Sequence, residues 1–287
     1  AKALHYVEME FDMAHPVKTI EALIQINQQL QNTEAAKGVL VYAATKVGGA
    51  SSVKEGWYEK LHDWTMALEA YEHRQRSAPD VWEWKLGRMR CHQALYEWEP
   101  LRELVRESNH LLFNASAASN AVSTAEQRYE LSKLGAAAAF NLAVSGDDGD
   151  EEEHWKMLQM YVEAMEPGCI AQGVMRIALA VHNHEFAVGQ QYIDVVRSMI
   201  GAELTALVGE SYKRAYGLMV GLQQLVELEE IILHNVSPST LPRDRLITLW
   251  RNRLDGCERD LDVWMELLSM QALAIKLPDN VHAAQKL

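Results

Sequence analysis

The stretch Leu61-His62-Asp63-Trp64 decides the fold class, because Leu95-Tyr96-Glu97-Trp98 repeats it 34 positions later, from 61 to 95. In each copy a small or aliphatic residue follows the tryptophan by three positions and a bulky residue follows it by seven. Such positions share one face of an α-helix. The positions expected to form the repeat core are Leu61, Trp64, Ala67 and Tyr71 in the first copy and Leu95, Trp98, Leu101 and Val105 in the second.

A period of 34 residues is typical of the tetratricopeptide motif, in which each repeat is a pair of antiparallel helices. One pair cannot bury its apolar stripe alone, so successive pairs stack into an α-solenoid. The same spacing recurs in weaker form from Trp155 and from Phe186. We therefore predict an all-α fold, an α-solenoid of tetratricopeptide-like antiparallel helix pairs. Its clearest repeats span residues 52–112, and the four aromatic residues Trp64, Trp98, Trp155 and Phe186 occupy equivalent buried places.

Two other stretches stand out along the chain. Residues 145–153 include eight acidic or glycine residues where a short turn would suffice, which indicates an acidic insertion in a solvated loop. The carboxylates lack the order of a calcium-binding EF-hand loop. Further on, apolar spacing from about Glu203 to Leu233 predicts one long helix.

Composition excludes several classes of protein. A formal net charge of −13 argues against a nucleic-acid surface, since such surfaces gather Lys and Arg to neutralise phosphates. The sequence has no apolar stretch long enough for a transmembrane span. Its three cysteines are far apart and form no CxxC pair, so they favour a reducing, cytosolic compartment over a disulfide framework or a zinc site.

We find no catalytic motif in the sequence. It contains no glycine-rich nucleotide loop, no nucleophile elbow and no zinc-protease motif. His182 and His184 are two positions apart and would point in different directions on a helix, so they are interpreted as surface histidines rather than metal ligands. Neither catalytic nor metal-binding residues are predicted.

Seven segments of the sequence carry a further signal: Ala1–Tyr6, Trp57–His62, Leu86–Cys91, Ala202–Leu207, Gly209–Tyr212, Arg214–Tyr216 and Leu228–Ile232. Together they resemble the FAT region of the target-of-rapamycin (TOR) kinases, which belong to the phosphatidylinositol 3-kinase-related family. The resemblance covers nearly the whole chain and departs from the family pattern at residues 114–122 and in the acidic insertion.

The resemblance implies that residues 1–287 are one helical-repeat segment inside a much longer chain. A FAT region of this kind forms a C-shape that clasps a C-terminal kinase domain, and the parent is a serine/threonine kinase of nutrient and growth signalling. The segment itself would be a non-catalytic scaffold. Implied partners are the parent's own kinase domain, neighbouring repeats and Raptor-like, Rictor-like and Lst8-like subunits. The implied location is the cytoplasm, with recruitment to the lysosome or vacuole surface through partners.

The family also binds inositol hexakisphosphate in a basic pocket. By its position in the segment Leu254–Arg259, Arg259 matches one arginine of that pocket, and the other basic residues would lie beyond Leu287. An equally acceptable interpretation of Arg259 is a surface ion pair with Glu258 or Asp260. No cofactor is expected within the segment alone.

Two alternatives remain open from the residues themselves. The first is a free-standing tetratricopeptide adaptor that binds a peptide, although such adaptors usually line their groove with Lys, Arg and Asn, and this chain has an acidic excess. The second is an enzyme with an unrecognised site. Sequence downstream of Leu287 would discriminate among these interpretations, because a kinase domain there carries a glycine-rich loop, a catalytic Asp and an Asp-Phe-Gly motif.

Overall fold

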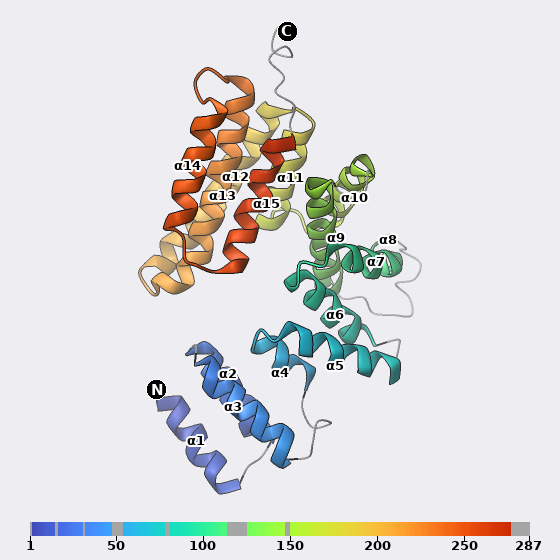
Figure 1. The fold of residues 1–287 in the computed structure, drawn as a ribbon, viewed down its shortest axis with the longest axis vertical. Coiled ribbons are helices and arrows are strands. Elements are labelled where there is room, and N and C mark those ends of the chain that lie inside the picture. The colour runs from blue at the N-terminus through green and yellow to red at the C-terminus, as the bar shows by residue number, and fades with distance from the viewer. Residues whose placement is uncertain are drawn as a thin grey trace. The chain divides into compact units, whose positions relative to one another are not determined.

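The computed structural model describes residues 2–14, 17–30, 32–47, 54–77, 81–113, 125–146 and 150–276. In these ranges the regular structure is entirely helical (Figure 1). The prediction of an all-α fold of stacked helix pairs is confirmed. The chain divides into two compact units, Ala1–Pro100 and Leu101–Leu287.

The first unit is a run of helices, most of which pack on the next one in the chain. The π-helical segment η1 extends α3, and α2 contacts both α3 and α4. In chain order the elements are α1 (Lys2–Ala14), α2 (Val17–Gln29), α3 (Thr33–Tyr42), η1 (Ala43–Val47), α4 (Glu55–Lys60), α5 (Trp64–Ser77) and α6 (Trp82–Ala94).

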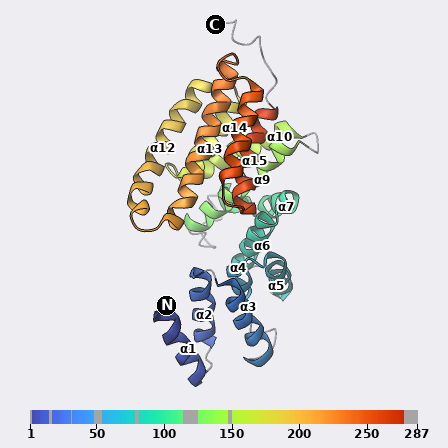
Figure 2. The same ribbon diagram turned by 60° about the vertical axis from the view of Figure 1, so that its left-hand side comes forward.

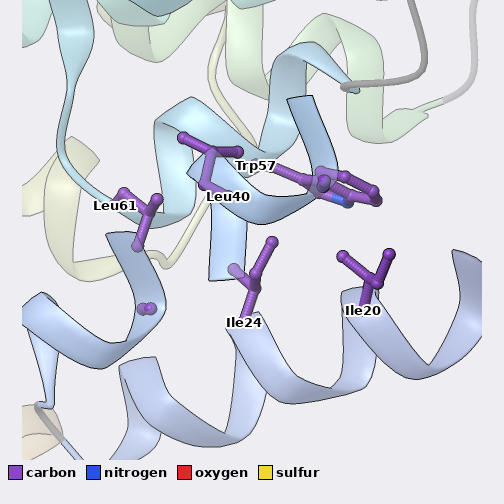
Figure 3. Close-up of a cluster of buried hydrophobic side chains, with 7 residues drawn as sticks. Ile20, Ile24, Leu40, Trp57 and Leu61 are labelled. Carbon is purple, nitrogen blue, oxygen red and sulfur yellow. The ribbon is translucent and has the colours of Figure 1, made fainter. Parts of the chain in front are cut away.

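The core of the first unit lies where α2, α3 and α4 meet. Figure 3 shows Trp57 of α4 above Ile20 of α2, with Ile24 and Leu40 beside it. Trp57 is only 2% exposed, and both isoleucines are fully buried. Isoleucines four positions apart lie on one helix face, which is why α2 presents a continuous apolar stripe to its neighbours.

The second unit contains the longer helices. Helix α7 spans the boundary between the units, and the remaining helices follow it. They are α7 (Trp98–Ser108), α8 (His110–Phe113), α9 (Ala125–Ser145), α10 (Glu151–Ala164), α11 (Ile170–His182), α12 (Phe186–Val208), α13 (Tyr212–Val236), α14 (Arg243–Gly256) and α15 (Leu261–Lys276).

The second unit repeats one arrangement of helices. Helix α9 pairs with α10, α11 pairs with α12, and α13 packs on both α12 and α11. Helices α9, α11 and α13 thus stand next to one another in one layer, and α10 and α12 form a second layer packed against them. This alternation is the helix-pair stacking that the sequence period predicts.

Three turns between successive helices have the same backbone geometry. His62, Tyr96 and His184, which follow α4, α6 and α11, have positive φ angles of 55°, 58° and 60°. After α4, the amide of His62 donates to the carbonyl of Glu59 and the amide of Asp63 to that of Tyr58, both at 3.0 Å. The other two turns make the same pair of bonds. This is the Schellman motif, which satisfies the last carbonyls of a helix.

Close approach between paired helices depends on glycine. Gly135 of α9 lies beneath the ring of Tyr161 of α10, and a Cβ added at this glycine would stand 2.8 Å from Cε1 of that ring. The Tyr161 hydroxyl donates to Oδ1 of Asn109 at 3.0 Å, which fixes the ring in place. A side chain at position 135 would therefore force the two helices apart.

Two expectations about local structure are wrong. The long helix expected from Glu203 to Leu233 is divided, because α12 ends at Val208 and α13 begins at Tyr212. The acidic insertion is also shorter than expected, since Glu151 begins α10 and the next two glutamates lie in its first turn. Carboxylates are favourable there because the helix N-terminus carries partial positive charge. Residues 147–149 and 114–124 lie outside the described residues.

Candidate functional site

The residues predicted to form the repeat core fall into two groups. Six are buried, and four are only partly buried. The buried residues are Leu61, Ala67, Tyr71, Leu101, Val105 and Trp155, and the partly buried residues are Trp64, Leu95, Trp98 and Phe186.

Trp64, Trp98 and Phe186 occupy equivalent places. Each is the first residue of its helix and comes two positions after a left-handed residue. Each ring makes an edge-on contact with the side chain of that residue, with centroids 5.5 Å apart for His62 and Trp64 and 5.9 Å apart for Tyr96 and Trp98. The expectation that Trp64 and Trp98 are buried is wrong, because the first residue of a helix lies at the turn, where neighbouring helices cover it on one side only.

Trp155 differs from these three residues. Helix α10 begins one turn earlier, at Glu151, so Trp155 is its fifth residue and not its first. Its ring stacks on His182 with centroids 4.0 Å apart and an interplanar angle of 11°, and it meets Phe140 edge-on at 6.2 Å. Burial lowers the pKa of His182, which favours the neutral ring in this stack.

The two histidines near the end of α11 lie in different local settings. His182 ends α11 and His184 lies in the following turn, and no group of three or more His, Cys, Asp or Glu side chains gathers within the described ranges. The thiol of Cys91 is buried, and burial raises its pKa to about 12, so this thiol is unreactive at neutral pH.

Arg259 lies in the connection between α14 and α15, and hydrogen bonds hold the residues on either side of it. The Glu258 amide donates to the Tyr216 hydroxyl at 2.8 Å, and Trp264 Nε1 donates to the Glu258 carbonyl at 3.0 Å. Asp260 caps α15 through a 2.9 Å bond from the Asp262 amide to its carboxylate.

The Arg259 side chain is exposed, and no ion pair with a described residue is found for it. The acidic residues nearest in sequence are Asp255, Glu258, Asp260 and Asp262. A polyphosphate at this place would therefore need cations from outside the local sequence, because these carboxylates repel it.

Helix α14 is attached to α13 through the partly buried carboxylate of Glu230. Both Nη atoms of Arg253 donate to Glu230, one of them at 2.7 Å, and Nε1 of Trp250 donates to the same carboxylate at 2.9 Å. The hydrogen bonds to Glu230 raise the pKa of Arg253 further. Such a bidentate pair sets the orientation of α14, and with it the start of the connection that carries Arg259.

Helix α15 packs on the side of α9, α11 and α13 that we call the inner face. Figures 1 and 2 both show α15 alongside α13. Leu267, Met270 and Leu273 of α15 are buried there, and the Ser269 hydroxyl donates to Oδ1 of Asn141 on α9 at 2.9 Å. The face that a tetratricopeptide adaptor would offer to a peptide is thus covered by the chain's own helix.

The helical spacing of Trp264, Leu267 and Leu268 predicts a helix at α15, but not where that helix packs. Its apolar residues have ordinary helical spacing, and nothing in that pattern names the partner helices. The only local signal was a pair of polar residues, Ser269 and Gln271, within an otherwise apolar stretch. No helix among the described residues is long and apolar enough to cross a membrane.

These features define a helical-repeat protein in which paired helices stack and the last described helix, α15, covers one face. The FAT-domain family model matches residues 132–287, more than half of the chain. The chain therefore belongs to the FAT-domain family.

Known relatives are similar over almost the whole chain. The serine/threonine-protein kinase tor1 of Schizosaccharomyces pombe is 37% identical over 285 residues, which cover 98% of this chain and 11% of that protein. The kinase mTor of Drosophila melanogaster is 35% identical over 282 residues, which cover 98% of this chain and 10% of that protein. The kinase TOR of Arabidopsis thaliana is 37% identical over 306 residues, which cover 98% of this chain and 12% of that protein. The chain thus spans about a tenth of the length of these relatives.

Proposed function

We propose that this chain is the scaffold segment of a TOR-type serine/threonine kinase, and that it clasps and restrains a kinase domain elsewhere in the longer protein. The observation that carries the proposal is similarity to TOR kinases along 98% of the chain. The fold supports it, since each repeat in such a stack is stabilised by its neighbours, so a change in one repeat affects the next. In this role the segment contributes shape and stiffness, and the chemistry belongs to the kinase domain.

A break in one of the repeats tests the restraint. Leu68→Pro in α5 of the full-length kinase removes a backbone donor in mid-helix and clashes with the preceding turn, at a cost of about 3 kcal/mol or more. We expect the rate of substrate phosphorylation to change although no catalytic atom is touched. Thr65→Pro is the matched control, because the first turn of the same helix tolerates proline. An unchanged rate in a folded Leu68→Pro kinase would contradict the restraint.

The proposal extends to the partners and location of the parent. We propose that the parent assembles with Raptor-like or Rictor-like and Lst8-like subunits, acts in nutrient and growth signalling, and works in the cytoplasm with recruitment to the lysosome or vacuole surface. Co-purification of these subunits with the full-length kinase tests the assembly. Its failure would leave the restraint within the kinase chain unaffected.

We further propose that Arg259 contributes one cation to an inositol hexakisphosphate pocket completed by residues outside this segment. Its exposed position and the absence of a partner for it among the described residues support this role. Full-length protein should bind inositol hexakisphosphate and lose affinity in Arg259→Ala, whereas the isolated segment should bind weakly or not at all. Equal affinities of wild-type and Arg259→Ala protein, measured by calorimetry at fixed salt, would remove Arg259 from the pocket.

The free-standing adaptor is the weaker candidate. An adaptor needs an open inner face, and here Leu267 and its neighbours on α15 cover it. If the adaptor interpretation were correct, the intact chain, with α15 in place, would bind a short peptide in a calorimetric titration.

A further inference from the structure

A carboxylate without access to solvent lies at the junction of α13 and α15. Glu227 of α13 is fully buried. One carboxylate oxygen accepts from Gln223 Nε2 at 3.1 Å, and the other accepts from Gln271 Nε2 of α15 at 3.0 Å. The bond to Gln271 joins residues 44 positions apart and is among the few polar contacts that attach α15 to the inner face.

The groups around Glu227 do not neutralise its charge. Helix α14 presents Arg253, but both Nη atoms of that residue already bond to Glu230. Helix α13 itself presents Glu230, which adds negative charge, and α15 presents the neutral amide of Gln271. A buried carboxylate is costly when its only direct partners are neutral amides, because hydrogen bonds replace only part of its lost hydration.

We propose that Glu227 and Gln271 form a proton-dependent latch that sets how firmly α15 covers the inner face. When Glu227 carries a proton, no charge is buried, and its carbonyl oxygen still accepts the amide of Gln271. When Glu227 is ionised, the same contact holds a charge out of water, and the docked position of α15 loses stability. Release of α15 would uncover Leu267, Met270 and Leu273 together with the face of α9, α11 and α13.

The sign of the pH effect follows from linkage. Burial raises the pKa of Glu227 above its ordinary value of 4.5, against the smaller opposing effects of Gln223, Gln271 and Arg253. A raised pKa in the docked state means that docking takes up a proton. The contribution to docking is therefore complete below the ordinary pKa and is lost as the pH rises through the raised value.

Hydrogen exchange of the α15 amides measures the latch directly. In the 287-residue chain, protection of these amides, corrected for intrinsic exchange rates, should fall as the pH rises above the ordinary carboxyl pKa of 4.5, by about tenfold for each unit by which docking raises the Glu227 pKa. The variant Glu227→Gln is neutral and nearly isosteric, so its α15 protection should lose this dependence on pH. Protection that depends equally on pH in wild-type and Glu227→Gln chains would overturn the proposal.

Two control variants separate Glu227 from its neighbours. Glu229→Gln changes a carboxylate of the same helix that faces Arg197 of α12, 2.6 Å away, and should leave the pH dependence of α15 intact. Glu266→Gln removes a carboxyl of α15 that bonds to Gln224 and whose pKa desolvation also raises. In Glu266→Gln, the part of the pH dependence of α15 protection that is due to Glu227 should persist.

A measurement on the wild-type chain covers the case in which a variant does not fold. The carboxyl carbon of Glu227 can be followed by NMR across the same pH range. Titration above the ordinary value of 4.5 is the expected result. Titration at or below that value would overturn the latch, because docking would then take up no proton.

Discussion

At the scale of single residues, left-handed backbone marks the turns that join successive helices. His62, Tyr96 and His184 all take this conformation although none is glycine. An L-residue pays about 1–2 kcal/mol for it, since its Cβ approaches the following carbonyl. Ring contacts with Trp64, Trp98 and Phe186 offset part of that cost. The repeated turn is thus stabilised by an aromatic pair where most helices use glycine.

Substitution of Tyr96 tests this account. Tyr96→Gly and Tyr96→Ala both lose the contact with Trp98, but only alanine keeps the backbone strain. The glycine variant should therefore be more stable than the alanine variant by about 1 kcal/mol in denaturant unfolding. At Lys85, inside α6, the order should reverse, because glycine is unfavourable within a helix. A more stable alanine variant at position 96 would contradict the strain.

At the scale of elements, the distance between paired helices is set by small residues in one helix and large residues in the other. Gly135 admits the ring of Tyr161, and Gly173 of α11 admits Val196 of α12 in the same way. Neither contact is visible in the helical periodicity, since glycine is neutral in a hydrophobic pattern. The contact explains why these glycines occur within helices despite their cost of about 0.5–1 kcal/mol relative to alanine.

The two kinds of helical glycine should respond oppositely to alanine. Gly135→Ala should destabilise the chain by about 1–3 kcal/mol, because the added methyl group meets a ring held by Asn109. Gly201→Ala in α12 should stabilise it by about 0.5–1 kcal/mol, since no atom lies within 4 Å of the new Cβ. Thermal unfolding of both variants compares them, and equal effects would rule out the close approach.

At the scale of the whole molecule, each compact unit has its own core, and the second is closed by its last described helix. Contacts between α15 and α9 join residues 128 positions apart, as in the bond from Ser269 to Asn141. The loop that this contact closes is long, but the entropic cost of closure grows only slowly with loop length. Burial of three large apolar side chains of α15 offsets that cost.

Two adjacent leucines test the closure. Leu267→Asp places a charge where the leucine is fully buried and should release α15, seen as faster hydrogen exchange in α15 and in the helices beneath it. Leu268→Asp changes a side chain that is 42% exposed and should leave exchange nearly unchanged. If both variants behave alike, α15 does not cover the inner face in solution.

The sequence by itself determined the helical fold and the 34-residue period, because these depend on residues close together in the chain. It also located Trp64 and Trp98 as equivalent positions. Only the tertiary structure decided that Trp155 is enclosed while Trp64 is not, and that α15 covers the inner face. Burial depends on which distant segments come together, as His182 does over Trp155 and Gln271 over Glu227. Local spacing does not identify such partners. The packing of distant segments therefore decided which surface stays exposed to other proteins.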